Sequence, residues 1–175
     1  NLAGQLITTT DAENNISTYT YDGCGRMKTV VDALNNQTAY TYDNNGNLIN
    51  VLAANNQNRT LQYDALNREI AEINHNGLST TKTYDSAGNL ISVTTPKGQT
   101  ITYQYDDLNR LIQKKYPNNT TVTYTYNELG QRTSMTDPAG TTTYTYDNLS
   151  RLQTVTRNGT TINRKRRNQN QPCYL

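Results

Sequence analysis

The chain consists of short runs in which aromatic or apolar residues alternate with polar ones, separated by turn-forming residues. Several runs end in two tyrosines with one residue, usually threonine, between them. Five such pairs occur: Tyr19 with Tyr21, Tyr40 with Tyr42, Tyr103 with Tyr105, Tyr124 with Tyr126, and Tyr144 with Tyr146. Period-two alternation in tyrosine and threonine, both strong strand formers, predicts β-strands.

A Tyr-Asp pair marks a repeat of 21 residues along the whole chain. The sixth copy reads Tyr126-Asn127, and the seventh follows after 20 residues instead of 21. The seven tyrosines are Tyr21, Tyr42, Tyr63, Tyr84, Tyr105, Tyr126 and Tyr146. A fixed period in this range is the signature of stacked repeat architectures.

Each repeat contains a hairpin turn directly after this tyrosine, which we count as position 0. Position 1 is Asp in six of the seven copies, position 4 is Gly, Asn or Ser, and position 6 is mostly apolar. Gly and Asn tolerate a left-handed backbone, and an Asp three residues earlier can accept a hydrogen bond that closes the turn. The pattern predicts a type I turn with a glycine bulge, which places Tyr105 opposite Leu111.

A second turn is predicted near position 14, which is Gly or Asn in six copies, and a second strand spans positions 5 to 10. Simple alternation places positions 6, 8 and 10 on one face of this strand and positions 7 and 9 on the other. Apolar residues occupy both sets, so the pattern does not say which face is buried. Each repeat is therefore expected to form two short antiparallel strands and two tight turns.

Composition favours a thin sheet over a thick globular core. Hydrophobic residues make up 33% of the 175 residues, Phe and Trp are absent, and 14 Tyr supply all the aromatic surface. The net charge is only +2, which together with the regular period argues against disorder. About 15 strands are expected, and an open sheet of more than ~10 strands usually curls or closes. Because no terminal cap is recognisable, we expect the chain to be a piece of a longer array.

Neither a membrane span nor a cofactor is expected. No apolar run approaches the ~18 residues that a membrane-spanning helix needs, and no signal peptide is visible. The two cysteines, Cys24 and Cys173, are too few for a disulfide framework or a metal site. We interpret Cys24 as an incidental turn residue.

The 21-residue period, the Tyr-Asp-x-x-Gly-Arg-Leu turn, the later Gly and the closing Tyr-x-Tyr together resemble the YD repeats of the RHS family, from Gly4 to about Gly159. That family includes bacterial RHS polymorphic toxins, Tc toxin B and C components, wall-associated proteins and teneurins. The resemblance implies an all-β fold of tandem ~21-residue β-hairpin repeats. These repeats would form a curled antiparallel ribbon that is part of an RHS-type shell.

The resemblance also implies a structural function. Shells of the bacterial toxins enclose a C-terminal toxic domain, so this chain is expected to contribute to a shell that encapsulates or presents a secreted toxin or effector polypeptide. The implied partners are flanking RHS repeats and a C-terminal toxin or effector domain. The implied location is secreted or associated with the cell surface.

Two features depart from the bacterial shells. Their closing segment carries an Asp-Pro-x-Gly-Leu signature linked to self-cleavage by aspartates, whereas this chain has Asp137-Pro138-Ala139-Gly140 followed by Thr141. We interpret this segment as an ordinary repeat turn with Gly140 as its position-14 glycine. In addition, seven repeats are fewer than a complete shell uses, so a closed capsule built by this chain alone is not expected.

No catalytic constellation can be assembled from the sequence, so the chain is not expected to be an enzyme. The only histidine, His75, lies in a predicted turn and has no recurring catalytic partner. The Asp at position 1 could line up as a carboxylate row, but calcium needs 6 to 8 oxygen ligands from close neighbours. Closure of its own turn is the favoured role of each Asp, and no metal site is expected.

The alternative function is an extracellular carbohydrate-binding or adhesin-like module. Aromatic faces stack on sugars and Asn side chains offer hydrogen bonds, which makes Tyr103 and Tyr124 the candidate glycan-binding residues. A tyrosine ladder is also what a sheet without Phe would use for its own packing. The sequence leaves both interpretations open.

The repeat array is predicted to span residues 1–159, as a partial repeat followed by seven copies. Residues 160–175 are predicted to be a basic, Asn/Gln-rich tail outside the repeat, containing Arg164-Lys165-Arg166-Arg167. One cluster of four cations without interleaved aromatics is weak evidence for nucleic-acid binding. No specific nucleic-acid partner is therefore expected.

Overall fold

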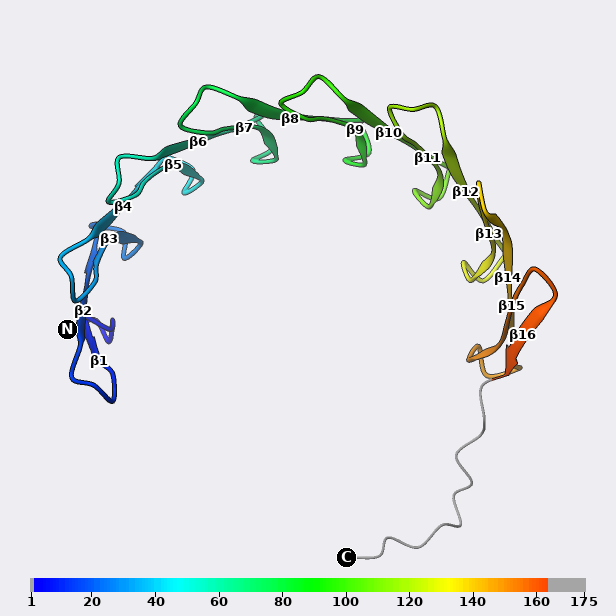
Figure 1. The fold of residues 1–175 in the computed structure, drawn as a ribbon, viewed down its shortest axis with the longest axis horizontal. Helices are drawn as coiled ribbons and strands as arrows, with labels where there is room; N and C mark the ends of the chain where they lie inside the picture. The colour runs from blue at the N-terminus through cyan, green and yellow to red at the C-terminus, as the bar shows by residue number, and fades with distance from the viewer. Residues whose placement is uncertain (1, 164–175) are drawn as a thin grey trace, which may run out of the picture. The chain divides into compact units, whose positions relative to one another are not determined.

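The computed structural model describes residues 2–163, which form 16 strands and no helix. No helix in this part of the chain could therefore cross a membrane. The strands form one antiparallel sheet in sequence order, which confirms the predicted all-β fold of tandem hairpins (Figure 1). They are β1 (Thr8–Thr10), β2 (Ile16–Tyr21), β3 (Met27–Val31), β4 (Gln37–Tyr42), β5 (Leu48–Leu52), β6 (Asn58–Tyr63), β7 (Glu69–Ile73), β8 (Ser79–Tyr84), β9 (Leu90–Thr94), β10 (Thr100–Tyr105), β11 (Leu111–Lys115), β12 (Thr121–Tyr126), β13 (Arg132–Asp137), β14 (Gly140–Tyr146), β15 (Leu152–Arg157) and β16 (Thr160–Asn163).

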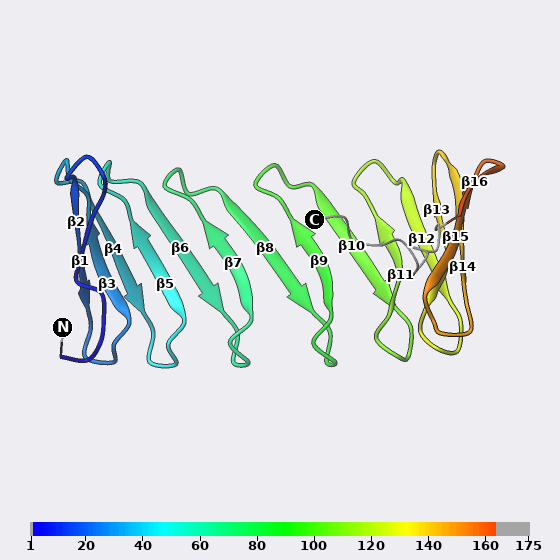
Figure 2. The ribbon, with the colours of Figure 1, turned by 90° about the horizontal axis from the view of Figure 1, so that it is seen from below.

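The chain divides into two compact units. Among the described residues, the first comprises residues 2–83 and 93–99, and the second comprises residues 84–92 and 100–163. In each unit, neighbouring strands run in opposite directions (Figure 2). The turns that follow the repeat tyrosines therefore lie at one end of the strands, and the second turns lie at the other end.

The turn after each repeat tyrosine has the predicted geometry. In the first copy, the N–H of Gly25 donates to the carbonyl of Asp22 (3.0 Å), and the N–H of Asp22 donates to the carbonyl of Arg26 (2.9 Å). Position 4 has a positive φ in all seven copies, for example 82° at Gly25 and 59° at Asn67. A left-handed backbone is costly for most L-residues, which explains why Gly and Asn predominate there.

The strand pairing contains a second bulge, next to the turn. Tyr21 lies opposite Met27 and Tyr19 opposite Val30, so β3 has one extra residue between positions 6 and 8. Tyr19 and Tyr21 share a face, and positions 6 and 9 must therefore share it with them, while positions 8 and 10 lie on the other face. The same shift recurs in β4–β5, β6–β7, β10–β11, β12–β13 and β14–β15. The simple alternation expected from the sequence is therefore wrong, because the bulge inserts one residue into it.

The bulge sorts the side chains into a tyrosine face and a threonine face. The tyrosine face carries the Tyr-x-Tyr pairs of the even-numbered strands together with positions 6 and 9 of the odd-numbered strands. The predicted pairing of Tyr105 with Leu111 is confirmed and belongs to this face. The threonine face carries hydroxyl pairs such as Thr20 with Thr29, whose oxygens lie 2.6 Å apart.

The sheet has no thick core. Among residues 2–163, the buried apolar side chains are Leu61 and Ala71, which are 6% and 7% exposed. Most side chains of the tyrosine face are only half-buried. The sheet is therefore stabilised chiefly by its backbone ladders, its turns and the cross-strand contacts of the tyrosine face.

The shorter interval between the last two repeat tyrosines comes from a shorter turn. Asp137 lies opposite Gly140, so Pro138 and Ala139 alone form the turn between β13 and β14. Gly140 has a φ of 128°, whereas the residues at position 14 of the five preceding copies have φ between 59° and 75°. The interpretation of Gly140 as an ordinary turn glycine is therefore wrong. It opens β14, and a Cβ there would lie 2.5 Å from the side chain of Asn158.

The sheet continues past residue 159, because β16 pairs with β15. Residues 164–175, which hold the basic cluster of the predicted tail, lie outside the described residues. The boundary between the array and the tail stays a prediction.

Candidate functional site

Each turn aspartate is used within its own turn, as its spacing predicts. Oδ1 of Asp106 accepts from the backbone N–H groups of Leu108 (3.0 Å) and Arg110 (2.9 Å), and Oδ2 accepts from Nε of Arg110 (2.7 Å). These donors hold the pKa of Asp106 below its ordinary value. The part of the chain that the structure describes contains no group of three or more His, Cys, Asp or Glu that could hold a metal ion.

The side chain at position 5 can link a repeat to the next one. Nη1 of Arg110 donates to the carbonyl of Asn127 in the following repeat (3.1 Å), and its guanidinium carbon lies 4.9 Å from the ring centre of Tyr126. Arg26 makes the equivalent two contacts with its following repeat. One arginine thus closes its own turn and contacts the next tyrosine.

The 21-residue pattern alone does not reveal this link, but a pattern at position 5 that recurs in every second copy does. Position 5 alternates between Arg and an amide, and the amides also reach forward, since Nδ2 of Asn89 donates to Oδ1 of Asn109 (2.8 Å). The arginines are Arg26, Arg68, Arg110 and Arg151, and the amides are Asn47, Asn89 and Gln131. This alternation is the sequence signal that marks position 5 as a contact between repeats.

The repeat tyrosines bind the preceding repeat. The hydroxyl of Tyr126 donates to the carbonyl of Leu111, at position 6 of the previous copy (2.8 Å). The register of β11 with β12 begins at Gln113 opposite Thr123, so the Leu111 carbonyl lies beyond that ladder. The hydroxyl therefore bonds a carbonyl that lies outside the β11–β12 register. The same bond is made by Tyr21, Tyr63, Tyr105 and Tyr146.

The two candidate glycan-binding residues, Tyr103 and Tyr124, lie on the tyrosine face of the second unit and are half-buried. Nζ of Lys114 lies 5.8 Å from the ring centre of Tyr103, and the guanidinium carbon of Arg132 lies 5.9 Å from that of Tyr124. Each ring thus has a cation of the same chain beside it. Their role in glycan binding stays a prediction.

Lys114 and Arg132 connect the tyrosines of this region. Nζ of Lys114 also lies 4.7 Å from the ring centre of Tyr116, and the guanidinium carbon of Arg132 lies 4.5 Å from that of Tyr144. Contacts of this kind are attractive because the face of an aromatic ring is electron-rich. We name the whole set the aromatic–cation cluster: Tyr103, Lys114, Tyr116, Tyr124, Arg132 and Tyr144.

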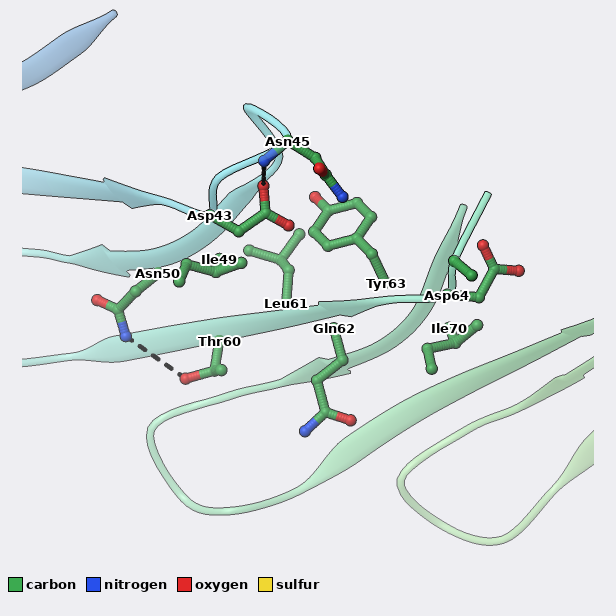
Figure 3. Close-up of a pocket in the computed structure, with 11 residues that line it drawn as sticks. Asp43, Asn45, Ile49, Asn50, Thr60, Leu61, Gln62, Tyr63, Asp64 and Ile70 are labelled. Carbon is green, nitrogen blue, oxygen red and sulfur yellow. Dashed lines mark hydrogen bonds between the residues drawn. The ribbon is translucent and has the colours of Figure 1, made fainter. Parts of the chain in front are cut away.

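A hollow of about 750 Å³ lies in the first unit, around β6 (Figure 3). Leu61 lines it and stands at the position where the preceding copy has Tyr40, so a smaller side chain replaces a ring. The carboxylates that line the hollow belong to Asp43 and Asp64, and both accept hydrogen bonds within their own turns. The lining also includes the polar residues Asn45, Asn50, Thr60 and Gln62.

The remaining candidate residues are used structurally or are exposed. Oδ1 and Oδ2 of Asp137 accept from Nη2 of Arg157 at 2.8 and 3.0 Å, and Arg157 is the main cause that lowers the pKa of this carboxyl. The Asp-Pro-x-Gly segment thus forms a turn within the array, although that turn is shorter than the second turns of the preceding copies. His75 and Cys24 are exposed in turns.

The RHS repeat profile matches nearly the whole sequence. The matched residues are 1–37, 42–79, 63–100, 84–121, 105–142 and 126–162. None of the curated proteins matches the chain.

Solved structures of Tc toxin proteins share the fold. The crystal structure of TcdB2–TccC3–TEV matches with a TM-score of 0.75 and 20% identity, over 93% of this chain and 11% of that one. The crystal structure of TcdB2–TccC3–Cdc42 gives 0.72 and 22%, over 85% and 10%. The Photorhabdus luminescens Tc holotoxin pore with a substituted TccC3 gives 0.69 and 22%, over 85% and 9%. This chain spans about a tenth of each of them, and all are parts of larger toxin assemblies.

Proposed function

The chain belongs to the RHS-repeat family, and from this premise we propose that it is a segment of a shell wall that encloses a secreted toxin or effector polypeptide. Its role is structural, without catalysis. The observation that carries the proposal is the linkage between consecutive repeats. Repeat tyrosines and position-5 side chains bond neighbouring copies, as Tyr126 does with Leu111, so the sheet grows by adding copies along one direction.

The two unlike faces of the sheet support an enclosing wall. The threonine face is lined with hydroxyl pairs, and the tyrosine face is half-buried and partly apolar. A single-layer wall has an inner and an outer surface, which face different surroundings. A hydroxyl-lined face and a partly apolar face suit such a wall. The names of two related structures join TcdB2–TccC3 to a further component, Cdc42 or TEV, which is consistent with a shell that carries cargo.

The proposal includes the partners and the location. Flanking RHS repeats continue the sheet at β1 and β16, and the cargo is a C-terminal toxin or effector polypeptide of the longer protein. Delivery of such a cargo requires export, so the protein is secreted or lies at the cell surface. No structural observation favours the carbohydrate-binding alternative, because the rings of Tyr103 and Tyr124 already lie beside Lys114 and Arg132.

The test is photo-crosslinking from the two faces. A photoreactive amino acid replaces Tyr124, on the tyrosine face, or its neighbour Thr125, on the threonine face, in the protein as the cell makes it. If the wall encloses a polypeptide, one face yields a covalent adduct with a cargo segment and the other does not. Adducts from neither position, or equal adducts from both, contradict enclosure.

A further inference from the structure

The charged residues on the tyrosine face of the first unit occur in pairs. Glu69 and Glu72 take positions 6 and 9 of β7, where most copies have apolar residues. Nζ of Lys82 lies 2.8 Å from a carboxylate oxygen of Glu69, and Nε of Arg59 lies 2.7 Å from one of Glu72. Two acids are balanced by two bases, so these replacements add no net charge to the face.

The tyrosine face of the second unit differs, because its two inserted cations have no acidic counterpart. Lys114 takes position 9 of β11 and Arg132 takes position 6 of β13. Within residues 2–163, the carboxylates of the second unit that form ion pairs are Asp106, Asp137 and Asp147, and their partners are other arginines. Lys114 and Arg132 instead contact tyrosine rings, which leaves two uncompensated positive charges on this face.

The cluster keeps hydrogen-bonding capacity for an anionic partner. The ammonium of Lys114 has three N–H donors, one of which is used by Tyr116, and the guanidinium of Arg132 has five. Stacking against a ring uses the electrostatic attraction without consuming the remaining donors. The rings also restrict both side chains, so less conformational entropy is lost when a partner binds. A planar carboxylate fits the fork of an arginine through two parallel hydrogen bonds.

We propose that the aromatic–cation cluster binds an unfolded acidic polypeptide segment. Its Asp or Glu carboxylates bind Lys114 and Arg132. This inference rests on the proposed function, since it gives the chemistry of the polypeptide segment that lies against this part of the wall.

A polypeptide fits the cluster better than a nucleic acid or a polysaccharide. Bases and sugars bind aromatic residues through a free ring face, and here Lys114 and Arg132 already lie against Tyr103 and Tyr124. Proteins that bind nucleic acids also commonly neutralise about 6–10 phosphates, whereas this cluster offers two cations. A carboxylate needs only the N–H groups that remain available.

The test measures binding of a labelled, unstructured Glu-rich peptide to the 175-residue chain by fluorescence anisotropy at low salt. The double variant K114Q/R132Q should weaken binding at least tenfold, since each charge-assisted hydrogen bond contributes on the order of a tenfold change in affinity. The matched control is K97Q/K115Q, which removes the same charge from exposed sites. Lys115 follows Lys114 directly but lies on the threonine face, opposite Thr121. The control should change affinity by less than about threefold.

A second variant and two competitors keep the result interpretable. R132K keeps the charge but loses the fork, so it should bind more tightly than K114Q/R132Q and less tightly than the unsubstituted chain. Circular dichroism checks that every variant keeps its β-structure. Equal losses in K114Q/R132Q and K97Q/K115Q, or tighter binding of oligo-thymidylate or a polyuronate than of the peptide, would overturn the proposal. If crosslinking shows enclosure but K114Q/R132Q binds normally, the wall function stands and the cluster assignment fails. If the peptide binds at the cluster but crosslinking shows no enclosure, the cluster assignment stands and the wall function fails.

Discussion

At the scale of single residues, position 1 needs a hydrogen-bond acceptor more than it needs a charge. In the sixth copy Asn127 replaces Asp, and its Oδ1 accepts from the backbone N–H groups of Leu129 (3.1 Å) and Gln131 (3.0 Å). Asp106 accepts from the equivalent groups of its own turn. The amide oxygen therefore serves the same purpose as the carboxylate.

The first prediction compares two substitutions at Asp106. Asp106→Ala removes both backbone acceptor bonds and should lower Tm by roughly 2–4 °C, whereas Asp106→Asn should lower it less. Thermal unfolding followed by circular dichroism measures both changes. Asp107→Ala is the control, because Asp107 is the exposed neighbour at position 2. Equal Tm values for the Ala and Asn variants would show that the acceptor does not matter.

The second prediction concerns acid. The side chain of Arg151 is the main cause that lowers the pKa of Asp147 from 3.8 to about 2, and Arg68 and Asn47 lower the pKa of Asp64 and Asp43. A depressed pKa in the folded state stabilises the fold above the unfolded value and loses that contribution as pH falls through the folded value.

Tm should therefore be nearly constant from neutral pH down to about pH 5 and fall between roughly pH 4 and pH 2. Asp147→Asn should make that fall shallower, because one of the shifted groups is removed. Thermal melts at constant ionic strength across this range provide the measurement. A Tm that does not change down to pH 2, or a fall centred near pH 6, would mean that the turn aspartates do not control acid stability.

At the scale of strands and hairpins, the tyrosine hydroxyls connect neighbouring copies. Tyr126→Phe keeps the ring but leaves the Leu111 carbonyl without its donor, so the free energy of unfolding should fall by about 0.5–1.5 kcal/mol. Urea denaturation of the variant measures this loss. Tyr124→Phe is the matched control two residues earlier on β12, since its hydroxyl makes no hydrogen bond with the described residues. If both variants lose the same stability, the hydroxyl ladder is not the cause.

The hairpins could be predicted from the sequence because their signals are local. Asp at position 1 and Gly or Asn at position 4 lie within one turn, and they set the pairing of Tyr105 with Leu111. The bulge beside that turn could not be predicted, because it arises from backbone pairing and has no residue type of its own. In the fifth copy, for example, Leu111 and Ile112 are both apolar, and either could occupy the tyrosine face.

The contacts between repeats also could not be predicted from the pattern within a single repeat. Arg110 meets Tyr126 across 16 residues, and Arg132 meets Tyr124 and Tyr144, so their proximity follows only once the strand register is known. Tyr103 and Tyr124 could be selected from the sequence as members of the tyrosine ladder. Their neighbouring cations could not, because positions 6 and 9 were assigned to opposite faces until the bulge placed them together.

At the scale of the whole molecule, β1 and β16 are the terminal strands of the sheet within residues 2–163. Every residue of β1 and β16 is exposed, and within residues 2–163 each of these strands pairs with one neighbouring strand. An unpaired strand edge presents N–H and C=O groups that can pair with another chain. In a longer RHS array, flanking repeats would cover these edges.

The most direct test of a wall segment is its mass in solution, measured by size-exclusion chromatography with light scattering at several concentrations. If β1 and β16 are edges that require neighbouring repeats, the average mass should rise with concentration above the 19.7 kDa of a single chain. A compact species of 19.7 kDa at every concentration would contradict the account, because it would mean that the sheet protects its own ends.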